Sequence, residues 1–160
     1  MIRAMKEADY SLLEDFLYNA IYIPDGEELP LRDVVFDPNV YVYIDGFGSK
    51  DGDLGVVAEV KNNEVVGMAW TRIIPAYGHL DKDTPELAIS VLPNYRGCGI
   101  GTMLMERLFK ILKDAGYKRT SLSVQQNNPA VMFYKRLGYV VTDEKVDHEG
   151  NEDFVMVKKL

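Results

Sequence analysis

A glycine-rich stretch gives the sequence its clearest chemical signal. It reads Arg-Gly-Cys-Gly-Ile-Gly-Thr from Arg96 to Thr102, between an apolar run at 87–92 and an amphipathic stretch at 100–115. Because glycine has no Cβ, the backbone of such a turn can approach a ligand closely. The free N–H groups at the start of the following helix then favour an anion. The pattern therefore predicts a strand, a turn and a helix that together hold a phosphate group.

Two common phosphate-binding loops do not fit these residues. A P-loop needs Gly-x-x-x-x-Gly-Lys-Ser/Thr, but Gly101 is followed by Thr102 and Met103 rather than by lysine. A dinucleotide-binding turn needs Gly-x-Gly-x-x-Gly and an acidic residue about 20 positions later. The spacing here is Gly-x-Gly-x-Gly, and the later region holds Lys118 and Arg119. The residues therefore support neither class of nucleotide-binding protein.

The stretch instead resembles the pyrophosphate loop of the GCN5-related N-acetyltransferase (GNAT) family, whose pattern is Arg/Gln-x-x-Gly-x-Gly/Ala. Arg96, Gly99 and Gly101 occupy the matching positions. A second block resembles the family's later strand, asparagine and short helix, and it comprises Ser121–Val124, Asn127, Ala130, Phe133, Tyr134 and Leu137–Tyr139. The resemblance is firm from Glu86 to Tyr139 and loose over residues 1–85.

This resemblance implies an α/β (α+β) fold, with a central mixed, mostly antiparallel sheet, two splayed parallel strands, and helices on both faces. We expect residues 1–160 to form one such domain, long enough for a substantial core. The implied activity is transfer of an acetyl group from acetyl-CoA to a primary amine, directly within a ternary complex. The acceptor is then a small-molecule or peptide amine. The alternative is a non-catalytic acyl-CoA-binding or regulatory module on the same fold.

The resemblance also implies which residues contact acetyl-CoA. The pyrophosphate lies against the glycine-rich loop, and the pantetheine arm lies between the two parallel strands, near an asparagine. The expected contacts are Ile89, Val91, Arg96, Gly97, Cys98, Gly99, Ile100, Gly101, Thr102 and Asn127. Arg96 has the alternative of packing elsewhere on the surface, and Asn127 that of a turn residue before Pro129. Cys98 occupies a variable position of the family's loop, and we interpret its side chain as incidental.

Two side chains are the expected catalytic groups. Tyr134 matches the family position that returns a proton to the leaving thiolate, and a tyrosine hydroxyl, with an ordinary pKa of about 10, is protonated at neutral pH. The attacking amine must lose a proton, because a lysine-like amine of pKa about 10.4 is mostly charged there. Glu86, at the start of the central strand, is the best candidate base. The alternatives are ordered water as the base, and a Glu86 that is merely a solvent-exposed residue at a strand end.

Apolar periodicity and turn residues predict the elements that must position this site. The first half of the chain is expected to form an edge strand Ile2–Ala4, a helix from Asp9 to Ile21, and a hairpin of Leu54–Val60 with Val65–Ile74. A central strand Glu86–Leu92, a helix Ile100–Ala115 and a parallel strand Thr120–Val124 follow. The chain then forms a short helix Pro129–Gly138 and a final antiparallel pair, Tyr139–Lys145 with Asp153–Lys159.

Some local details of these elements are also predicted. Asp9 is the expected N-cap of the first helix, and Asp37-Pro38 is the expected start of another. Residues 40–47 combine helical spacing with strand propensity, and both remain open. Trp70 is expected in the core, with the wall of the substrate pocket as the alternative. The apolar face of the long helix is expected to bury Ile100, Met103, Leu104, Leu108, Ile111 and Leu112.

Two irregular loops, Tyr22–Pro30 and Pro75–Pro85, are expected to decide which amine is accepted. The first carries Asp25, Glu27 and Glu28, which form either an acidic rim that attracts a cationic amine or an ordinary solvated loop.

The composition narrows the class of partner. Apolar residues make up 47% of the chain, and no apolar run approaches the roughly 20 residues of a membrane span. The formal charge of −7, without a basic stripe, argues against nucleic acid and favours a cationic amine, unless the acidity serves solubility alone. The single cysteine and the lack of a signal peptide predict a cytoplasmic protein. His79 and His148 lack metal-site spacing, so no metal is expected. The resemblance to the GNAT family implies that the final strands can form a homodimer.

Overall fold

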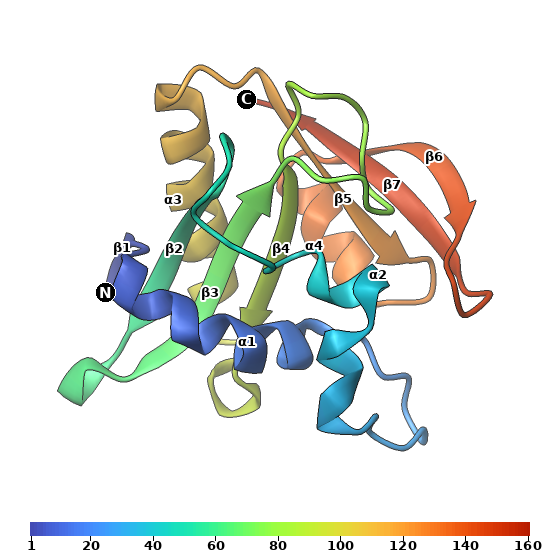
Figure 1. Ribbon diagram of the computed structural model, residues 1–160, viewed down its shortest axis with the longest axis horizontal. Helices are drawn as coiled ribbons and strands as arrows, with labels where there is room; N and C mark the ends of the chain where they lie inside the picture. The colour runs from blue at the N-terminus through green and yellow to red at the C-terminus, as the bar shows by residue number, and fades with distance from the viewer.

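The computed structural model describes residues 1–160, and these are built around one seven-stranded sheet (Figure 1). The strand order is β1-β2-β3-β4-β5-β7-β6, and every neighbouring pair is antiparallel except β4 with β5. The strands are β1 Ile2–Ala4, β2 Leu54–Glu59, β3 Val65–Arg72, β4 Glu86–Val91, β5 Arg119–Gln125, β6 Val140–Val146 and β7 Glu152–Lys159. The mixed, mostly antiparallel sheet is confirmed.

Helices cover both faces of this sheet, as predicted. The α-helices are α1 Leu13–Ala20, α2 Pro38–Tyr41, α3 Ile100–Asp114 and α4 Ala130–Arg136 (Figure 1). Short 3-10 helices span Glu7–Leu12, Arg32–Phe36, Lys61–Asn63 and Pro93–Tyr95. Side chains alternate between the two faces of the sheet along each strand, and so they form two hydrophobic clusters. One cluster packs against α1 and α2, and the other packs against α3 and α4. None of the helices combines the length and the apolar character that crossing a membrane requires.

The parallel pair diverges almost as soon as it forms. The register between β4 and β5 consists of the single pair Glu86 with Ser121, whereas β5 and β7 are paired from Arg119 to Gln125. The N–H of Ser121 donates to the carbonyl of Pro85 at 3.1 Å, just before the strands separate. This is the splay that the resemblance implied. It leaves the rest of β4 without a strand partner on that side.

The predicted position of Asp9 at the start of the first helix is wrong. Asp9 lies inside the 3-10 helix Glu7–Leu12, and α1 begins only at Leu13. Its carboxylate accepts the backbone N–H of Lys6 at 2.7 Å and both terminal nitrogens of the Arg3 guanidinium, at 2.8 and 2.9 Å. The residue therefore joins the preceding strand to the 3-10 helix from the third position of its capping box, and Lys6 is the N-cap. The sequence pattern did not distinguish a tight 3-10 turn from the first turn of an α-helix.

The predicted buried face of the long helix needs one correction. Met103 is 47% exposed, and Met105 is buried in its place. The reason is helical geometry, because residues three or four positions apart share a face. Met103 lies on the same face as Arg107 and Lys110, both exposed, whereas Leu104 lies on the face that reaches the sheet.

The stretch that was open between helix and strand forms a single helical turn. Asp37 caps α2, its carboxylate accepting the N–H of Asn39 at 2.9 Å, as predicted. Turns then carry the chain to Gly48, with Ile44 and Phe47 buried. Trp70 is fully buried in the core, and its indole N–H donates to the Tyr43 carbonyl at 3.0 Å.

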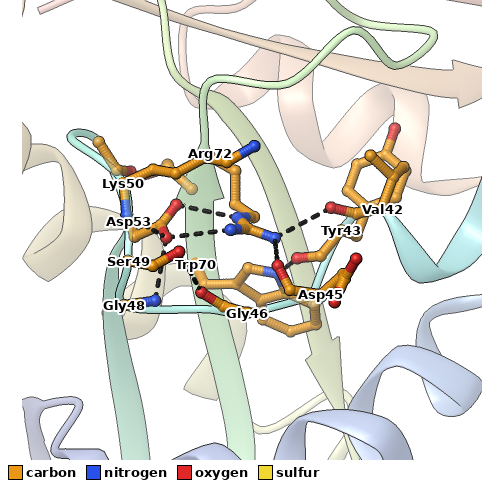
Figure 2. Close-up of polar contacts among 12 residues, drawn as sticks. Val42, Tyr43, Asp45, Gly46, Gly48, Ser49, Lys50, Asp53, Trp70 and Arg72 are labelled. Carbon is orange, nitrogen blue, oxygen red and sulfur yellow. Dashed lines mark hydrogen bonds and ion pairs between the residues drawn. The ribbon is translucent and has the colours of Figure 1, made fainter.

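A buried ion pair fixes the loop that follows this turn (Figure 2). The Arg72 guanidinium on β3 donates from Nε to Asp53 Oδ1 at 2.9 Å and from Nη2 to Oδ2 at 3.1 Å. Its Nη1 donates to the carbonyls of Val42 and Asp45 at 3.1 and 2.6 Å. Asp53 also accepts the N–H groups of Gly48 and Lys50. Both charged side chains are at most 2% exposed, and together they satisfy four backbone groups of this loop.

Replacing Asp53 with alanine should reduce the free energy of unfolding by about 3–5 kcal/mol, because it leaves a buried guanidinium without its counter-charge. Urea denaturation measures this loss. The matched control is Asp114→Ala, which removes the exposed pair with Lys110 and should change stability by less than about 0.5 kcal/mol. Equal losses of stability in the two variants would contradict the stabilising role of the buried pair between Arg72 and Asp53.

Candidate acetyl-CoA and amine site

A cavity of about 970 Å³ lies where the diverging strands meet the glycine-rich loop. Its walls come from the end of α1 and the loop after it, the second half of β4, the start of α3 and the start of α4. The lining residues are Tyr18–Ile23, Leu29, Pro30, Ile89–Val91, Pro93, Tyr95–Gly97, Gly99, Gly101, Thr102, Asn128–Ala130, Phe133 and Tyr134. A volume of this size suits a ligand as large as a cofactor.

The glycines of the loop are required by its geometry. Gly97 and Gly99 have φ of +75° and +84°, a region that side chains rarely adopt, and an added Cβ at either would meet no heavy atom within 4 Å. Gly101 instead allows close packing, because its Cβ would lie 3.4 Å from the Phe133 ring. The first N–H after Arg96 that donates to a backbone carbonyl is that of Met103. The loop therefore combines open space with unpaired N–H donors at the N-terminus of α3.

Two of the predicted loop contacts lie outside the cavity wall. Cys98 is exposed, with its Sγ near the Arg96 carbonyl at 3.6 Å, and Ile100 packs into the cluster under α3. Arg96 lines the cavity, yet its guanidinium also donates to the carbonyls of Val91 at 2.8 Å and Asn19 at 3.4 Å. It therefore joins the end of β4 to the end of α1 while its charge borders the cavity.

The backbone of β4 faces the cavity at the predicted positions. The N–H of Leu92 donates to Val66 on β3 at 2.9 Å. Because neighbouring residues of a strand direct their backbone groups to opposite sides, Val91 and Ile89 direct theirs toward the gap beside β5. Both residues line the cavity.

Sequence reasoning did not assign Ser90, which also lines the cavity. This serine is 4% exposed, and its Oγ has no hydrogen-bond partner. The signal was there, as a single polar residue in an apolar strand.

Tyr134 on α4 lies in the cavity wall and packs against Phe133 and Tyr139. Burial raises the pKa of its hydroxyl to about 12, so the group stays protonated at neutral pH.

The asparagine that lines the cavity wall is Asn128 rather than the predicted Asn127. Asn128 Oδ1 accepts the N–H of Ala130 at 2.9 Å and so caps α4, whereas the carbonyl of Asn127 accepts the Tyr22 hydroxyl at 3.3 Å.

Glu86 is neither solvent-exposed, as the sequence alternative had it, nor part of the cavity wall. It is 2% exposed at the far end of β4 from Val91. Its Oε2 accepts the Tyr43 hydroxyl, and its Oε1 is buried without a partner. Burial raises the pKa of its carboxyl to about 7, against the opposing effect of the Tyr43 hydrogen bond.

The two loops expected to decide the acceptor differ in position. The loop after α1 contributes Tyr22, Ile23, Leu29 and Pro30 to the cavity, while its acidic residues stay exposed to solvent. The loop 75–85 contributes nothing to this cavity.

The family model for the acetyltransferase (GNAT) family matches residues 17–139. The chain belongs to this family. A ribosomal protein bS18-alanine N-acetyltransferase of Haemophilus influenzae is 32% identical over 84 residues, which are 52% of this chain and 53% of that protein. A mycothiol acetyltransferase of an Arthrobacter species is 30% identical over 86 residues, 53% of this chain and 27% of that protein. The chain thus matches about half or less of these relatives' lengths.

The fold of the GNAT family extends over the whole chain. A crystal structure of a GNAT-family acetyltransferase from Streptococcus pneumoniae superposes with a TM-score of 0.70 at 20% identity, covering 100% of this chain and 98% of that one. This likeness includes residues 1–16 and 140–160, which the family model leaves out.

The raised pKa of Glu86 predicts a pH dependence of stability. Its ordinary carboxyl pKa is 4.5 and its folded value is about 7, so between these values the folded protein keeps a proton that the unfolded chain has lost. Its contribution to stability therefore falls as pH rises from 4.5 to 7. Relative to the wild type, Glu86→Gln should gain up to about 3 kcal/mol over this range, at about 1.36 kcal/mol per pH unit.

Urea unfolding of both proteins from pH 4 to pH 8 measures this difference. Asp153, whose pKa burial raises to about 6, titrates in both proteins and so cancels. Parallel stability curves for the two proteins would show that the Glu86 carboxyl is not buried as described.

Proposed function

We propose that this protein transfers an acetyl group from acetyl-CoA to a primary amine, directly within a ternary complex. The observation that carries the proposal is the single cavity that joins the glycine-rich loop, the unpaired side of β4 and the hydroxyl-bearing face of α4. Membership of the GNAT family supports the same reaction class. The acceptor is a small-molecule or peptide amine, since the relatives' names include both a ribosomal protein alanine and mycothiol.

The groups around the cavity suit the two polar parts of acetyl-CoA. The pyrophosphate is held by the N–H groups of Gly97 to Thr102 at the positive end of the α3 dipole, with Arg96 adding a charged donor. The pantetheine arm lies along β4 in place of the absent strand partner, and Asn128 rather than Asn127 borders it. The N–H of Val91 polarises the thioester carbonyl, and such a donor is worth about 2.7–4 kcal/mol in acyl transfer.

The transfer itself needs two proton movements. The free amine attacks the thioester carbon, a C–N bond forms, and the C–S bond then breaks to release the thiolate. Tyr134 gives its hydroxyl proton to that thiolate, a role suited to a tyrosine that stays protonated at neutral pH. The proton that the amine loses goes to Glu86, which is reached from the cavity through water because its carboxyl lies outside the wall.

Replacing Tyr134 with phenylalanine should lower kcat about 10²- to 10⁴-fold, the usual contribution of a general acid, and leave acetyl-CoA affinity within about twofold. Free-thiol release with a panel of primary amines gives kcat, and calorimetry gives the affinity. Tyr139→Phe is the matched control, because this neighbouring tyrosine is buried outside the cavity. Binding of acetyl-CoA without turnover of any amine by the wild type would support the non-catalytic alternative instead.

Replacing Gly99 with alanine should weaken acetyl-CoA binding about tenfold, because relief of roughly 1–2 kcal/mol of left-handed strain moves the N–H groups of the loop. Calorimetry on the folded variant tests this. Gly116→Ala is the control, since Gly116 has a similar φ of +94°, equally open surroundings, and no place in the cavity. The two variants should lose similar stability. Equal affinity in both would remove the loop from the binding site.

A further inference from the structure

Tyr43 lies on the turn after α2 and reaches Glu86, 43 residues later in the chain. Its hydroxyl donates to Glu86 Oε2. Burial and the neighbouring negative charge of Glu86 raise the pKa of this hydroxyl well above its ordinary value, so it remains a donor. The contact is therefore a hydrogen bond from a neutral group to a carboxylate.

The backbone around Tyr43 is held from β3 by two side chains (Figure 2). The Trp70 indole donates to the carbonyl of Tyr43 itself, at 3.0 Å. The Arg72 guanidinium donates to the carbonyls on either side, at Val42 and Asp45. All three acceptors belong to one turn, and the two donors are fully or almost fully buried. The position of the tyrosine ring is thus set by the sheet.

Arg72 and Glu86 are opposite each other in the β3–β4 register, yet they form no ion pair. The guanidinium is occupied by Asp53 through Nε and Nη2, and by the two carbonyls through Nη1. An arginine bound to Glu86 would hold its carboxyl ionised and fully paired. The neutral Tyr43 hydroxyl satisfies one oxygen only, and Oε1 stays without a partner.

The other groups that face this carboxyl do not complete its pairing. The backbone of Gly78, on the loop 75–85, favours the ionised carboxyl and so lowers its pKa, and Gly78 packs so closely that a Cβ there would lie 2.8 Å from the carboxyl carbon. Lys145 on β6 acts only through its charge. Asp153 on β7 and Ser123 on β5 lie near the Tyr43 hydroxyl. Tyr43 is therefore the only side chain that donates a hydrogen bond to Glu86.

We propose that Tyr43 is a positioning residue for the transfer, holding Glu86 by one oxygen so that Oε1 remains free to accept the proton of the amine. This rests on the proposed function. In the step, the N–H bond of the attacking amine breaks, its proton passes through a bridging water, and an O–H bond forms at Oε1. Arg72 contributes by staying bound to Asp53, and Trp70 by fixing the Tyr43 carbonyl.

The test is the pH profile of kcat/KM for Tyr43→Phe. Loss of the hydrogen bond removes a group that favours the ionised carboxylate, so the acidic limb should move up by about one pH unit. Activity should fall roughly tenfold on the acidic limb and recover near pH 9, with KM for acetyl-CoA unchanged. In a Glu86→Gln background, Tyr43→Phe should have no further effect. Tyr41→Phe is the control, because it removes a hydroxyl from α2 and leaves the Glu86 hydrogen bond in place.

A second measurement does not depend on activity. NMR titration of the Glu86 side-chain carboxyl carbon should show its midpoint rise in Tyr43→Phe and stay unchanged in Tyr41→Phe. An acidic limb and an NMR midpoint that both stay in place would overturn the inference, as would a uniform loss of activity at every pH. Turnover by Tyr43→Phe with an acidic limb and an NMR midpoint that do not move would overturn this inference and leave the proposed function standing. Absence of turnover with every amine overturns the proposed function and the catalytic part of the inference with it.

Discussion

The rest of the site depends on the early separation of β4 from β5. A buried backbone N–H or carbonyl without a partner costs about as much as a lost hydrogen bond, so strands rarely diverge inside a sheet. Here the pairing ends after Glu86 and Ser121, and the backbone groups of Ile89 and Val91 face a cavity. Such a gap is stable only when water or a ligand satisfies it. An extended chain with amide groups, such as pantetheine, has the right chemistry for this position.

The gap also explains why the glycine-rich loop has so few side chains. Only the 3-10 helix Pro93–Tyr95 separates the loop from β4, so any ligand lying in the gap must pass the loop. Two left-handed glycines turn the chain into α3, and the third lets Phe133 of α4 pack against the helix start. The strand separation, the turn and the position of α4 are therefore one structural unit. This unit is also the most local part of the site, because it lies within residues 86–139.

That locality decides what the sequence could predict. The glycine-rich loop, the strand before it and the hairpins follow from neighbouring residues, and the structure has them within a few positions of their predicted bounds. Asp9 and Met103 were misplaced because a cap and a 3-10 turn, or adjacent faces of one helix, look alike in a short pattern. The burial of Glu86 could not be predicted, because it depends on Tyr43 and Gly78, which tertiary packing alone brings to it.

Desolvation shifts the pKa of both proposed proton-transfer groups, Tyr134 and Glu86, with opposite consequences. It raises the pKa of Tyr134 to about 12, which keeps this hydroxyl protonated at neutral pH. It raises the pKa of Glu86 to about 7, so that at neutral pH this carboxyl is about half ionised instead of fully ionised. The same physical cause therefore supplies a donor at one end of β4 and a group able to accept a proton at the other. The pKa of Glu86 is not lowered again, because Arg72, its cross-strand neighbour, is already bound to Asp53. The buried ion pair between Arg72 and Asp53 thus preserves the raised pKa of Glu86, with which it forms no ion pair.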